Sequence, residues 1–303
     1  MNSIIAKGSH YFGLTGFPIT IRRSKTSSSK EPSHPHDLTK VEHSHDFCEL
    51  VIVTQGQAVQ CLEGVDLPIA AGDIFLLQGH QKHFFHSRQD LELINIMYNP
   101  KELNLPENEL RRMPGYCAMF VLEPHYRNEH KFNSRLHVEQ IALAYLNKIS
   151  SDMELECEQK VAGYEIALRS KLLEIITYLS RSYTQGSSIE SQALIRVGNV
   201  IGAMENSYDK DWKLKELASI ANMSKSNLLT VFRKATHQSP IEYLIHLRIQ
   251  RAMEMMRSTD MTITEIAFCV GFNDSNYFSR QFRKITGITA RQYLAQQQQF
   301  STV

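Results

Sequence analysis

An internal repeat near the C-terminus constrains the fold of this chain more than any other sequence feature. Residues 232–234 and 282–284 both read Phe-Arg-Lys, and a threonine and a Tyr-Leu pair recur after each at the same spacing. Upstream, Glu-Leu-Ala at residues 216–218 matches Glu-Ile-Ala at residues 265–267. These two are 49 residues apart, whereas the Phe-Arg-Lys motifs are 50 residues apart. A repeat at fixed spacing indicates a duplicated structural unit, in which one of the two turns is a residue longer.

Each copy has the pattern of two short helices joined by a tight turn. In the second copy, residues 262–294, apolar side chains recur at helical spacing on both sides of Gly271. Glycine readily adopts the positive φ that such a turn often needs. Residues 262–265 have the Thr-x-x-Glu pattern of a capping box. In the first copy we predict helices at residues 212–221 and 225–236, so each copy is a helix-turn-helix.

A long helix at residues 240–257 is predicted to link the two copies. Ser239 and Glu242 have the spacing of a capping box, and Pro240 suits the first helical position. This helix would hold the two units at a fixed separation. Recognition helices that enter successive major grooves on one DNA face lie about 34 Å apart. Residues 191–206 are predicted to form the leading helix of the same domain.

Four short motifs lie at fixed positions in this region: Asn-Met-Ser at residues 222–224, Tyr-Leu-x-x-x-Arg-x-x-x-Ala at 243–252, Gly-Phe-Asn-Asp-Ser at 271–275 and Tyr-Phe-Ser-Arg-x-Phe at 277–282. Together they closely resemble the AraC/XylS family of bacterial transcription regulators, over about a third of the chain. The chain departs from the family at His237, where glycine is usual, and at Ala290, where proline is usual. These departures concern local turn geometry.

The resemblance also indicates which residues contact DNA. A recognition helix presents to DNA the face opposite its buried stripe. Family positions that touch bases match Ser226, Leu229 and Thr230 in the first copy, and Ser275, Asn276, Ser279 and Arg280 in the second. The candidate DNA-binding residues are Lys225, Ser226, Leu229, Thr230 and Arg233 in the first copy, and Asp274, Ser275, Asn276, Ser279, Arg280 and Arg283 in the second.

Arg280 is the strongest candidate for reading a base, because arginine can bond a guanine edge with two hydrogen bonds. Its alternative partners are a phosphate or a carboxylate. Arg233 and Arg283 are expected to contact phosphate. Asp274 has an equally good alternative role as a helix N-cap. Leu229 suits either contact with a thymine methyl group or the protein core.

Length and composition agree with two domains, because 303 residues with 42% apolar residues can form two cores. No stretch has the eighteen or more apolar residues of a transmembrane helix, and no signal peptide is evident. The five cysteines are scattered and form no Cys-x-x-Cys pair. Free thiols in a reducing compartment fit this pattern, so we expect a cytoplasmic protein without membrane contact.

The net charge of +1 is unevenly distributed along the chain. From Ile189 onward, 14 Lys and Arg residues stand against 10 Asp and Glu residues, a net charge of +4. The preceding part has 19 basic and 22 acidic residues, a net charge of −3. A mildly basic C-terminal part suits a phosphate backbone, although a charge of this size is ordinary for a domain.

Residues 41–99 have a β pattern of short apolar runs separated by glycines. Such spacing is typical of a sandwich or barrel. The strand candidates are residues 50–53, 59–62, 73–77 and 91–98, and the glycines are Gly56, Gly64, Gly72 and Gly79.

The same stretch is similar to the two motifs of the cupin fold. In metal-binding cupins, the matching positions hold the ion, and here they are His43, His45, Glu49 and His83. Three imidazoles and a carboxylate suit a divalent transition metal. Gln78 and His80 replace the proline and glycine usual in the second motif. In this family the pocket more often holds a small molecule, so we predict that the four residues bind a ligand, without a metal or cofactor. Capping of a strand by His43 or His45 is the alternative. His80 and His86 are expected on surface loops.

Residues 100–183 have a helical pattern. Two apolar stripes, one at residues 138–146 and one at 161–179, are broad enough for core packing. The family resemblance favours a dimerisation helix, and both roles are compatible.

The predicted fold class is α+β: a cupin-like β-barrel with flanking helices, followed by an all-α DNA-binding domain with two helix-turn-helix units. The predicted segments are an N-terminal arm and mobile segment (1–40), a cupin-like sensing domain (41–134), a helical dimerisation segment (135–183), a linker (184–190) and the DNA-binding domain (191–303).

The resemblance implies a ligand-responsive, sequence-specific transcription regulator, expected to be an activator and not an enzyme. Its expected partners are operator DNA, RNA polymerase, a second copy of the chain and a small-molecule effector. Residues 46–53 and 271–276 look similar to regulators of rhamnose use, so a sugar is the leading effector class. The alternatives are a metal-dependent cupin enzyme with an appended DNA-binding domain, and a constitutive DNA-binding protein whose N-terminal domain only dimerises.

Overall fold

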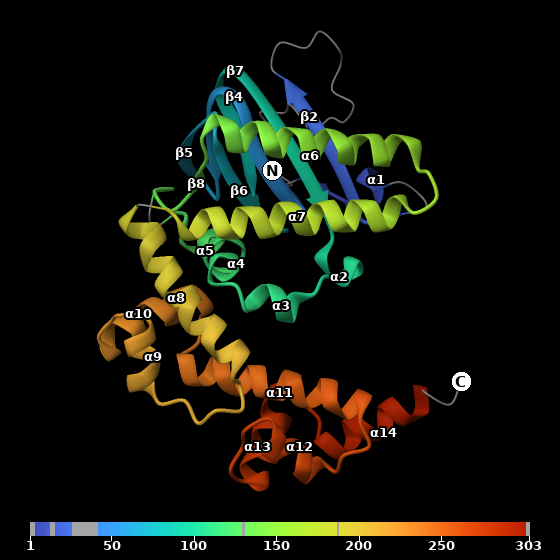
Figure 1. Ribbon diagram of the computed structural model, residues 1–303, viewed down its shortest axis with the longest axis vertical. Coiled ribbons are helices and arrows are strands. Elements are labelled where there is room, and N and C mark those ends of the chain that lie inside the picture. Colours follow the sequence, from blue (N-terminus) through green and yellow to red (C-terminus); the bar gives the residue numbers. More distant parts are fainter. Residues whose placement is uncertain (1–3, 13–15, 26–41, 129–130, 187, 301–303) are drawn as a thin grey trace. The chain divides into compact units, whose positions relative to one another are not determined.

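The computed structural model of the chain describes residues 4–12, 16–25, 42–128, 131–186 and 188–300. They form two compact units, Met1–Gly198 and Asn199–Val303 (Figure 1). The first unit contains all the described strands and the second is helical, so the predicted α+β class is confirmed. Residues 1–3, 13–15 and 26–40 of the predicted N-terminal arm, and Ser187 of the predicted linker, lie outside the described residues.

One eight-stranded sheet forms the centre of the N-terminal unit. Its main path runs β1-β3-β7-β4-β6-β8, while β2 pairs with β7 and β5 with β4. All pairings are antiparallel except that of β1 with β3. The strands are β1 (Ile4–Ala6), β2 (Ile19–Lys25), β3 (His43–His45), β4 (Cys48–Leu62), β5 (Val65–Ala70), β6 (Asp73–Leu77), β7 (His83–Tyr98) and β8 (Leu136–His137).

Gly56 bends a strand that the sequence pattern divides in two. The predicted strands at residues 50–53 and 59–62 are parts of the single strand β4, so this separation was wrong. Gly56 has a φ of +74°, and a Cβ there would lie 2.3 Å from the carbonyl oxygens of Gln89 and Asp90. The pairing of β4 with β7 shifts register on both sides of this glycine, as at a β-bulge. The bend keeps both long strands paired along their length.

One hydrophobic core cluster of this unit is built on the strands β4 to β7. Its buried residues come from β4 to β7 together with Phe132: Val51, Val53, Ala58, Leu62, Leu67, Ile69, Phe75, Leu77, Phe85, Leu91, Leu93 and Phe132. After β7 the chain forms short helical turns, which are α2 (Pro100–Leu103), α3 (Glu107–Arg111), α4 (Pro114–Tyr116), the π-helix η1 (Cys117–Leu122) and α5 (Glu123–Tyr126); α1 (Gly8–Tyr11) precedes β2.

Two long helices, α6 (Gln140–Gln159) and α7 (Tyr164–Thr184), lie side by side over the sheet (Figure 1). Arg23 of β2 donates to Glu154 of α6 at 2.8 Å and ties the helix to the sheet. The apolar stripes of the two helices are only partly buried. Leu168 and Leu172 are fully buried, whereas Ile166 is 71% exposed. The prediction that each apolar stripe packs into the core is therefore correct for only part of the stripe, and the rest is exposed.

Seven helices complete the chain: α8 (Ile189–Asn206), α9 (Leu214–Ile220), α10 (Lys225–Thr236), α11 (Pro240–Ser258), α12 (Ile263–Cys269), α13 (Ser275–Thr286) and α14 (Ala290–Phe300). The pairs α9–α10 and α12–α13 are the two copies of the repeat, and α11 links them. Both predicted capping boxes are present, Ser239 with Glu242 and Thr262 with Glu265. No helix within the described residues is long and apolar enough to cross a membrane.

Candidate functional site

The second helix of each copy is held by a capped N-terminus and a buried apolar stripe. In α10, Ser224 accepts a hydrogen bond from the Asn227 amide at 3.2 Å, and Leu228 and Phe232 are fully buried. One side of α10 is thus committed to the core. The opposite side is left for contact with a partner.

Helix α13 follows the same plan with a different cap. Asp274 accepts a hydrogen bond from the Asn276 amide at 2.7 Å, while Phe278 and Phe282 are fully buried. The geometry therefore gives Asp274 the N-capping role that the sequence left open. Its position at the N-terminus of α13 also agrees with the preference of helix N-termini for negative charge.

The candidate DNA-binding residues gather on the exposed faces of these two helices. Leu229 and Ser275 are half-buried. The other nine are exposed: Lys225, Ser226, Thr230, Arg233, Asp274, Asn276, Ser279, Arg280 and Arg283. Hydroxyl groups on both faces bond to their own helix, Thr230 to the Ser226 carbonyl at 3.0 Å and Ser279 to the Ser275 carbonyl at 2.9 Å.

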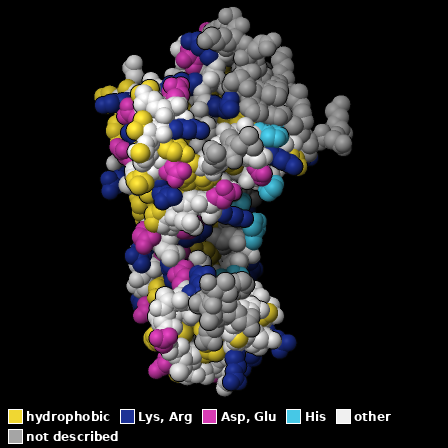
Figure 2. Space-filling view, turned by 90° about the vertical axis from the view of Figure 1, so that its right-hand side faces the viewer, with side chains coloured by type: hydrophobic (Ala, Val, Ile, Leu, Met, Phe, Trp, Pro, Cys, Tyr) yellow, Lys and Arg dark blue, Asp and Glu magenta, His cyan; other side chains and the backbone are white. Residues whose placement is uncertain are grey.

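The arginines on these faces are not engaged by acidic side chains. Within the described parts of the chain, no carboxylate lies within 4.0 Å of Arg233, Arg280 or Arg283. The Arg280 guanidinium lies 5.7 Å from the centre of the Tyr277 ring, where a cation–π contact can orient it. Basic side chains (dark blue) project from the surface of the C-terminal unit in the space-filling view (Figure 2). Guanidinium groups without a carboxylate partner are suited to phosphate oxygens and guanine edges.

Two buried arginines of α11 hold this linking helix against the residues that precede the first copy. The Arg248 Nε donates to the Tyr208 carbonyl at 2.7 Å, and the Arg251 guanidinium lies 2.9 Å from a Glu205 carboxylate oxygen. Both arginines are over 90% buried. In the sequence Arg248 is visible only as a motif position, and no pattern marks Arg251. Their partners lie about 40 residues earlier in the chain, so no local pattern signals them.

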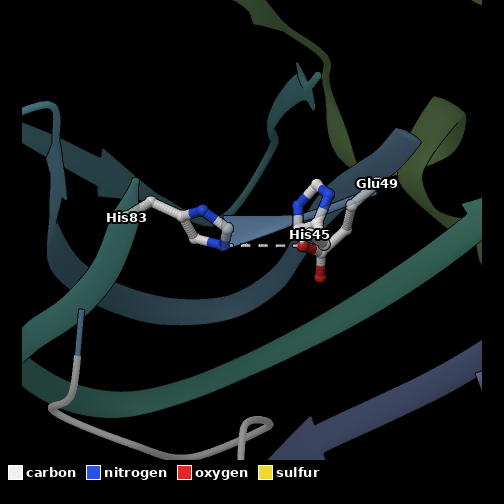
Figure 3. Close-up of side chains that lie close together, drawn as sticks. All are labelled: His45, Glu49 and His83. Carbon is white, nitrogen blue, oxygen red and sulfur yellow. Dashed lines mark ion pairs between the residues drawn. The ribbon is translucent and has the colours of Figure 1, made fainter. Parts of the chain in front are cut away.

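In the N-terminal unit, three of the four predicted ligand-binding residues meet at one point. Figure 3 shows His45 of β3, Glu49 of β4 and His83 of β7 facing one another. The Nε2 atoms of His45 and His83 lie 3.3 and 3.6 Å from Glu49 Oε2, and the three side chains offer ligand atoms within 4.8 Å of one another. His43 lines the same cavity, with its ring centre 4.4 Å from that of His83, but it is not part of this group.

The three side chains, called the His-Glu-His cluster below, are buried from solvent. Burial by itself raises the pKa of the Glu49 carboxyl, but contacts with His45 and His83 outweigh burial and hold that pKa well below its ordinary value. The cluster therefore favours an ionised carboxylate. The His80 amide donates to the His45 carbonyl at 2.7 Å, so the turn that departs from the cupin pattern is still closed beside the cluster.

The cavity at the cluster is small. It has a volume of about 20 Å³ and is lined also by Tyr11, Phe47 and Asn95, which sequence analysis did not single out. A single water needs roughly 10–15 Å³, and small-molecule pockets typically have roughly 300–1,000 Å³. In this structure the cavity has room for a water or an ion, and not for a sugar.

A larger hollow of about 790 Å³ lies elsewhere in the N-terminal unit. It is bordered by β8, the start of α6, the end of α7 and the first turn of α8. Arg135 and His137, both at its rim, contact buried Asp73 at 2.9 and 2.8 Å. The sequence gives no sign of this hollow, because its walls come from segments about 50 residues apart.

Comparison with known proteins gives two family matches. The "Helix-turn-helix domain" family matches residues 217–296, and the "AraC-like ligand binding domain" family matches residues 31–127. The HTH-type transcriptional activator RhaR of Escherichia coli O139:H28 is 29% identical over 261 residues, covering 86% of this chain and 88% of RhaR. RhaR of Shigella boydii serotype 4 has the same identity and coverage.

Among solved structures, the C-terminal domain of the response regulator yesN from Fusobacterium nucleatum is 31% identical. The match covers 31% of this chain and 93% of that domain, with a TM-score of 0.30.

Proposed function

The chain belongs to the AraC family of helix-turn-helix DNA-binding regulators and has an AraC-like ligand-binding domain, and from this premise we propose that it activates sugar-use genes in response to a small-molecule effector. Relatives named as transcriptional activators match most of the chain, which supports activation. The resemblance of residues 46–53 and 271–276 to regulators of rhamnose use supports a sugar effector.

One observation carries the DNA-binding part of the proposal. Two recognition helices, α10 and α13, expose polar and basic faces with uncommitted arginines, and α11 holds both in one unit. In this proposal Arg280 reads a base, while Arg233 and Arg283 bond phosphates. The remaining candidates on the two faces complete the interface with operator DNA.

The effector is proposed to occupy the 790 Å³ hollow in the N-terminal unit. Its volume suits a sugar, and its polar rim offers hydrogen bonds from Arg135 and His137. Glu190 and Ser191, in the first turn of α8, also line it. Because α8 continues into the unit that begins at Asn199, a ligand here contacts the helix that leads to the DNA-binding region. The effector would act by binding more tightly to one conformation of that helix than to another, and so shift the balance between them.

A homodimer in the cytoplasm is the proposed working form, with RNA polymerase as its partner at the promoter. Large apolar side chains are exposed on α6, on α7 and in the loop between them: Ile141 is 86%, Ile166 71% and Val161 60% exposed. A dimer interface on this helix pair would bury exposed apolar surface of this kind. The cytoplasmic location follows from access to chromosomal DNA, and the proposed role requires no catalytic activity.

The decisive experiment selects DNA from a randomised library with the purified full chain, with and without a panel of sugars. We expect two short motifs about one helical turn apart, with occupancy altered by one sugar. Arg135→Ala should reduce the sugar response without changing the selected motifs, and Arg291→Ala, an exposed arginine on α14, serves as the control. Selection without sequence preference would refute the proposed function. Selection indifferent to every sugar would refute the sugar effector only.

A further inference from the structure

Another cavity, of about 200 Å³, lies where residues 11–12 and 17–20 meet the turn between α6 and α7. Figure 1 shows α1 and β2 close to the end of the helix pair at which this turn lies. The cavity shares no lining residue with the 790 Å³ hollow proposed for the effector, called the effector hollow below. A water takes up roughly 30 Å³ of liquid, so a compact molecule of several waters' size fits here.

Aromatic rings form much of the wall of this cavity. Tyr11, Phe12, Phe17 and Tyr164 all line it. The rings of Phe17 and Tyr164 meet edge to face, with 6.1 Å between their centres, and so join the segment before β2 to the first turn of α7. Ring faces and edges of this kind favour a planar aromatic ligand, which can stack on one ring and meet another edge-on.

Lys160 supplies the only charge on the lining of the cavity. It is exposed, and no carboxylate in the described part of the chain lies within 4.0 Å of its ammonium group. Cys157 also lines the cavity, but burial raises the pKa of its thiol to about 11, so the thiol is neutral near pH 7. The remaining lining side chains are aromatic, aliphatic or hydroxyl-bearing. The lining therefore combines a mainly apolar wall with one positive charge that has no acidic partner.

Cages of aromatic rings often bind cations, but here two of the rings already have one nearby. The Arg22 guanidinium lies 5.3 Å from the centre of the Tyr11 ring, and the Arg169 guanidinium lies 5.8 Å from that of the Phe17 ring. A cationic ligand would be repelled by both arginines and by Lys160. The charges around this cavity therefore favour an anion.

Lys160 occupies a backbone position that normally goes to glycine. It ends α6 in the left-handed region, with a φ of +46°. Glycine is usual at such helix ends, because residues with a Cβ are strained there. Strain of this kind is often found at ligand sites, where the surrounding structure maintains it. Glycine would suit the turn better, so the lysine side chain needs another explanation, and its position at the cavity supplies one.

We propose that this cavity binds a small aromatic carboxylate. The aromatic side chains of the wall contact its ring. The Lys160 ammonium donates a hydrogen bond to its carboxylate, and a hydrogen bond between opposite charges is stronger than one between neutral groups. Such a ligand joins Phe17 to the α6–α7 turn. This site goes beyond the proposed sugar response and does not depend on it.

The test titrates sodium benzoate into the purified full chain without DNA. Ligand-observed NMR should show saturable binding, and benzoate should raise the melting temperature, because a ligand of the folded state stabilises it. Benzamide has the same ring without the charge, and acetate has the charge without the ring. Each should bind at least about 10-fold more weakly, since one lacks a charge-assisted hydrogen bond and the other lacks the burial of a ring.

Variants locate the bound benzoate. Lys160→Gly removes the ammonium and suits the left-handed backbone. The ligand-free variant should therefore melt at the same or a higher temperature, while its benzoate affinity falls at least about 10-fold. Lys160→Arg should retain binding. Lys148→Gln is the matched control, because Lys148 is an exposed lysine of the same helix that does not line the cavity.

Absence of saturable binding overturns the proposal, as does benzamide binding equal to that of benzoate or an unaltered benzoate affinity in Lys160→Gly. Loss of binding in Arg135→Ala but not in Lys160→Gly would place benzoate in the effector hollow and would overturn the proposal too. No DNA or sugar enters the assay, so each of these results leaves the proposed regulatory function standing.

Discussion

The turn of the first helix-turn-helix passes through Asn222, whereas the turn of the second passes through Gly271. Both residues have a positive φ, 49° and 92°. Asn222 is exposed, but a Cβ on Gly271 would lie 2.4 Å from the Asp209 carbonyl oxygen. The two copies share a backbone turn, and the close approach of the Asp209 backbone explains the glycine of the second copy.

The exposed faces of the copies differ more than their cores. Thr230 in the first copy occupies the repeat position of Arg280 in the second, and Leu229 that of Ser279. Arg233 and Arg283 are the same residue at the same position. The copies therefore share the expected phosphate contact but offer different groups to the bases. This difference predicts that the second copy contributes more to sequence selection.

The largest expected effect comes from Gly271→Ala. The positive φ costs roughly 1–2 kcal/mol for a residue with a Cβ, and the clash with Asp209 adds roughly 1–3 kcal/mol. We expect the unfolding free energy of the C-terminal unit to fall by about 2–5 kcal/mol in urea denaturation. Asn222→Ala should cost less than about 1 kcal/mol, since no comparable clash arises. Equal losses would mean that packing does not distinguish the two turns.

The next effect concerns DNA affinity. Arg280→Ala should weaken operator binding by about 10–100-fold and relax the base preference at one position. Thr230→Ala, at the equivalent position, should weaken it less than about 10-fold. Fluorescence anisotropy with the selected operator measures both. Arg233→Ala and Arg283→Ala are the internal standard. Each should reduce the slope of log affinity against log salt concentration by about one, as expected for the loss of one phosphate contact. A greater loss with Thr230→Ala would reverse the assignment of the dominant copy.

A smaller effect is expected at the helix C-caps, where α10 ends at His237 and α13 at Gly287. Both have a positive φ, 58° and 80°. A Cβ on Gly287 meets no atom within 4 Å, so Gly287→Ala should cost only about 1 kcal/mol of conformational energy. His237→Gly should stabilise the unit by roughly 0.5–1 kcal/mol. Thermal unfolding of the two variants should therefore shift in opposite directions; a shift in the same direction would contradict this account.

The smallest expected effect is a difference between α9 and α12, the first helices of the two copies, in how salt changes the pKa of one glutamate in each. The Lys213 amide lowers the pKa of Glu216, with a further contribution from Lys210, and the Thr262 hydroxyl and amide lower that of Glu265. A depressed folded-state pKa stabilises the fold above the unfolded pKa, near 4.3, and this stabilisation is lost as pH falls through the folded value.

NMR titration should find both carboxyl midpoints below the ordinary value. High salt should raise the pKa of Glu216 more than that of Glu265, because Lys210 is charged and Thr262 is neutral. Glu265→Gln should remove the acid-side contribution of the second copy. Identical salt responses would show that the backbone amides alone set both values.

Most of the DNA-binding unit follows from local sequence. The predicted helix at residues 225–236 is α10, and the linking helix at 240–257 differs from α11 by one residue at its C-terminal end. Capping boxes and buried stripes involve residues within one or two helical turns of each other, so the sequence displays them. The convergence of His45, Glu49 and His83 was also readable, through a family motif.

Other features depended on contacts between distant segments. Sequence patterns did not distinguish the buried Leu168 from the exposed Ile166, because burial depends on which face of α7 meets its neighbours. Nor did they indicate that β4 continues through Gly56.

The sequence by itself therefore determined the two helix-turn-helix units, their capped helices and the residue types of the cluster, because these depend on spacing along one segment. Only the tertiary structure decided how Arg248 and Arg251 are anchored and how small the cavity at the cluster is. It alone set which nitrogens of His45 and His83 face Glu49, because the Phe47 and Gln81 carbonyls take the other nitrogens once the strands are in register.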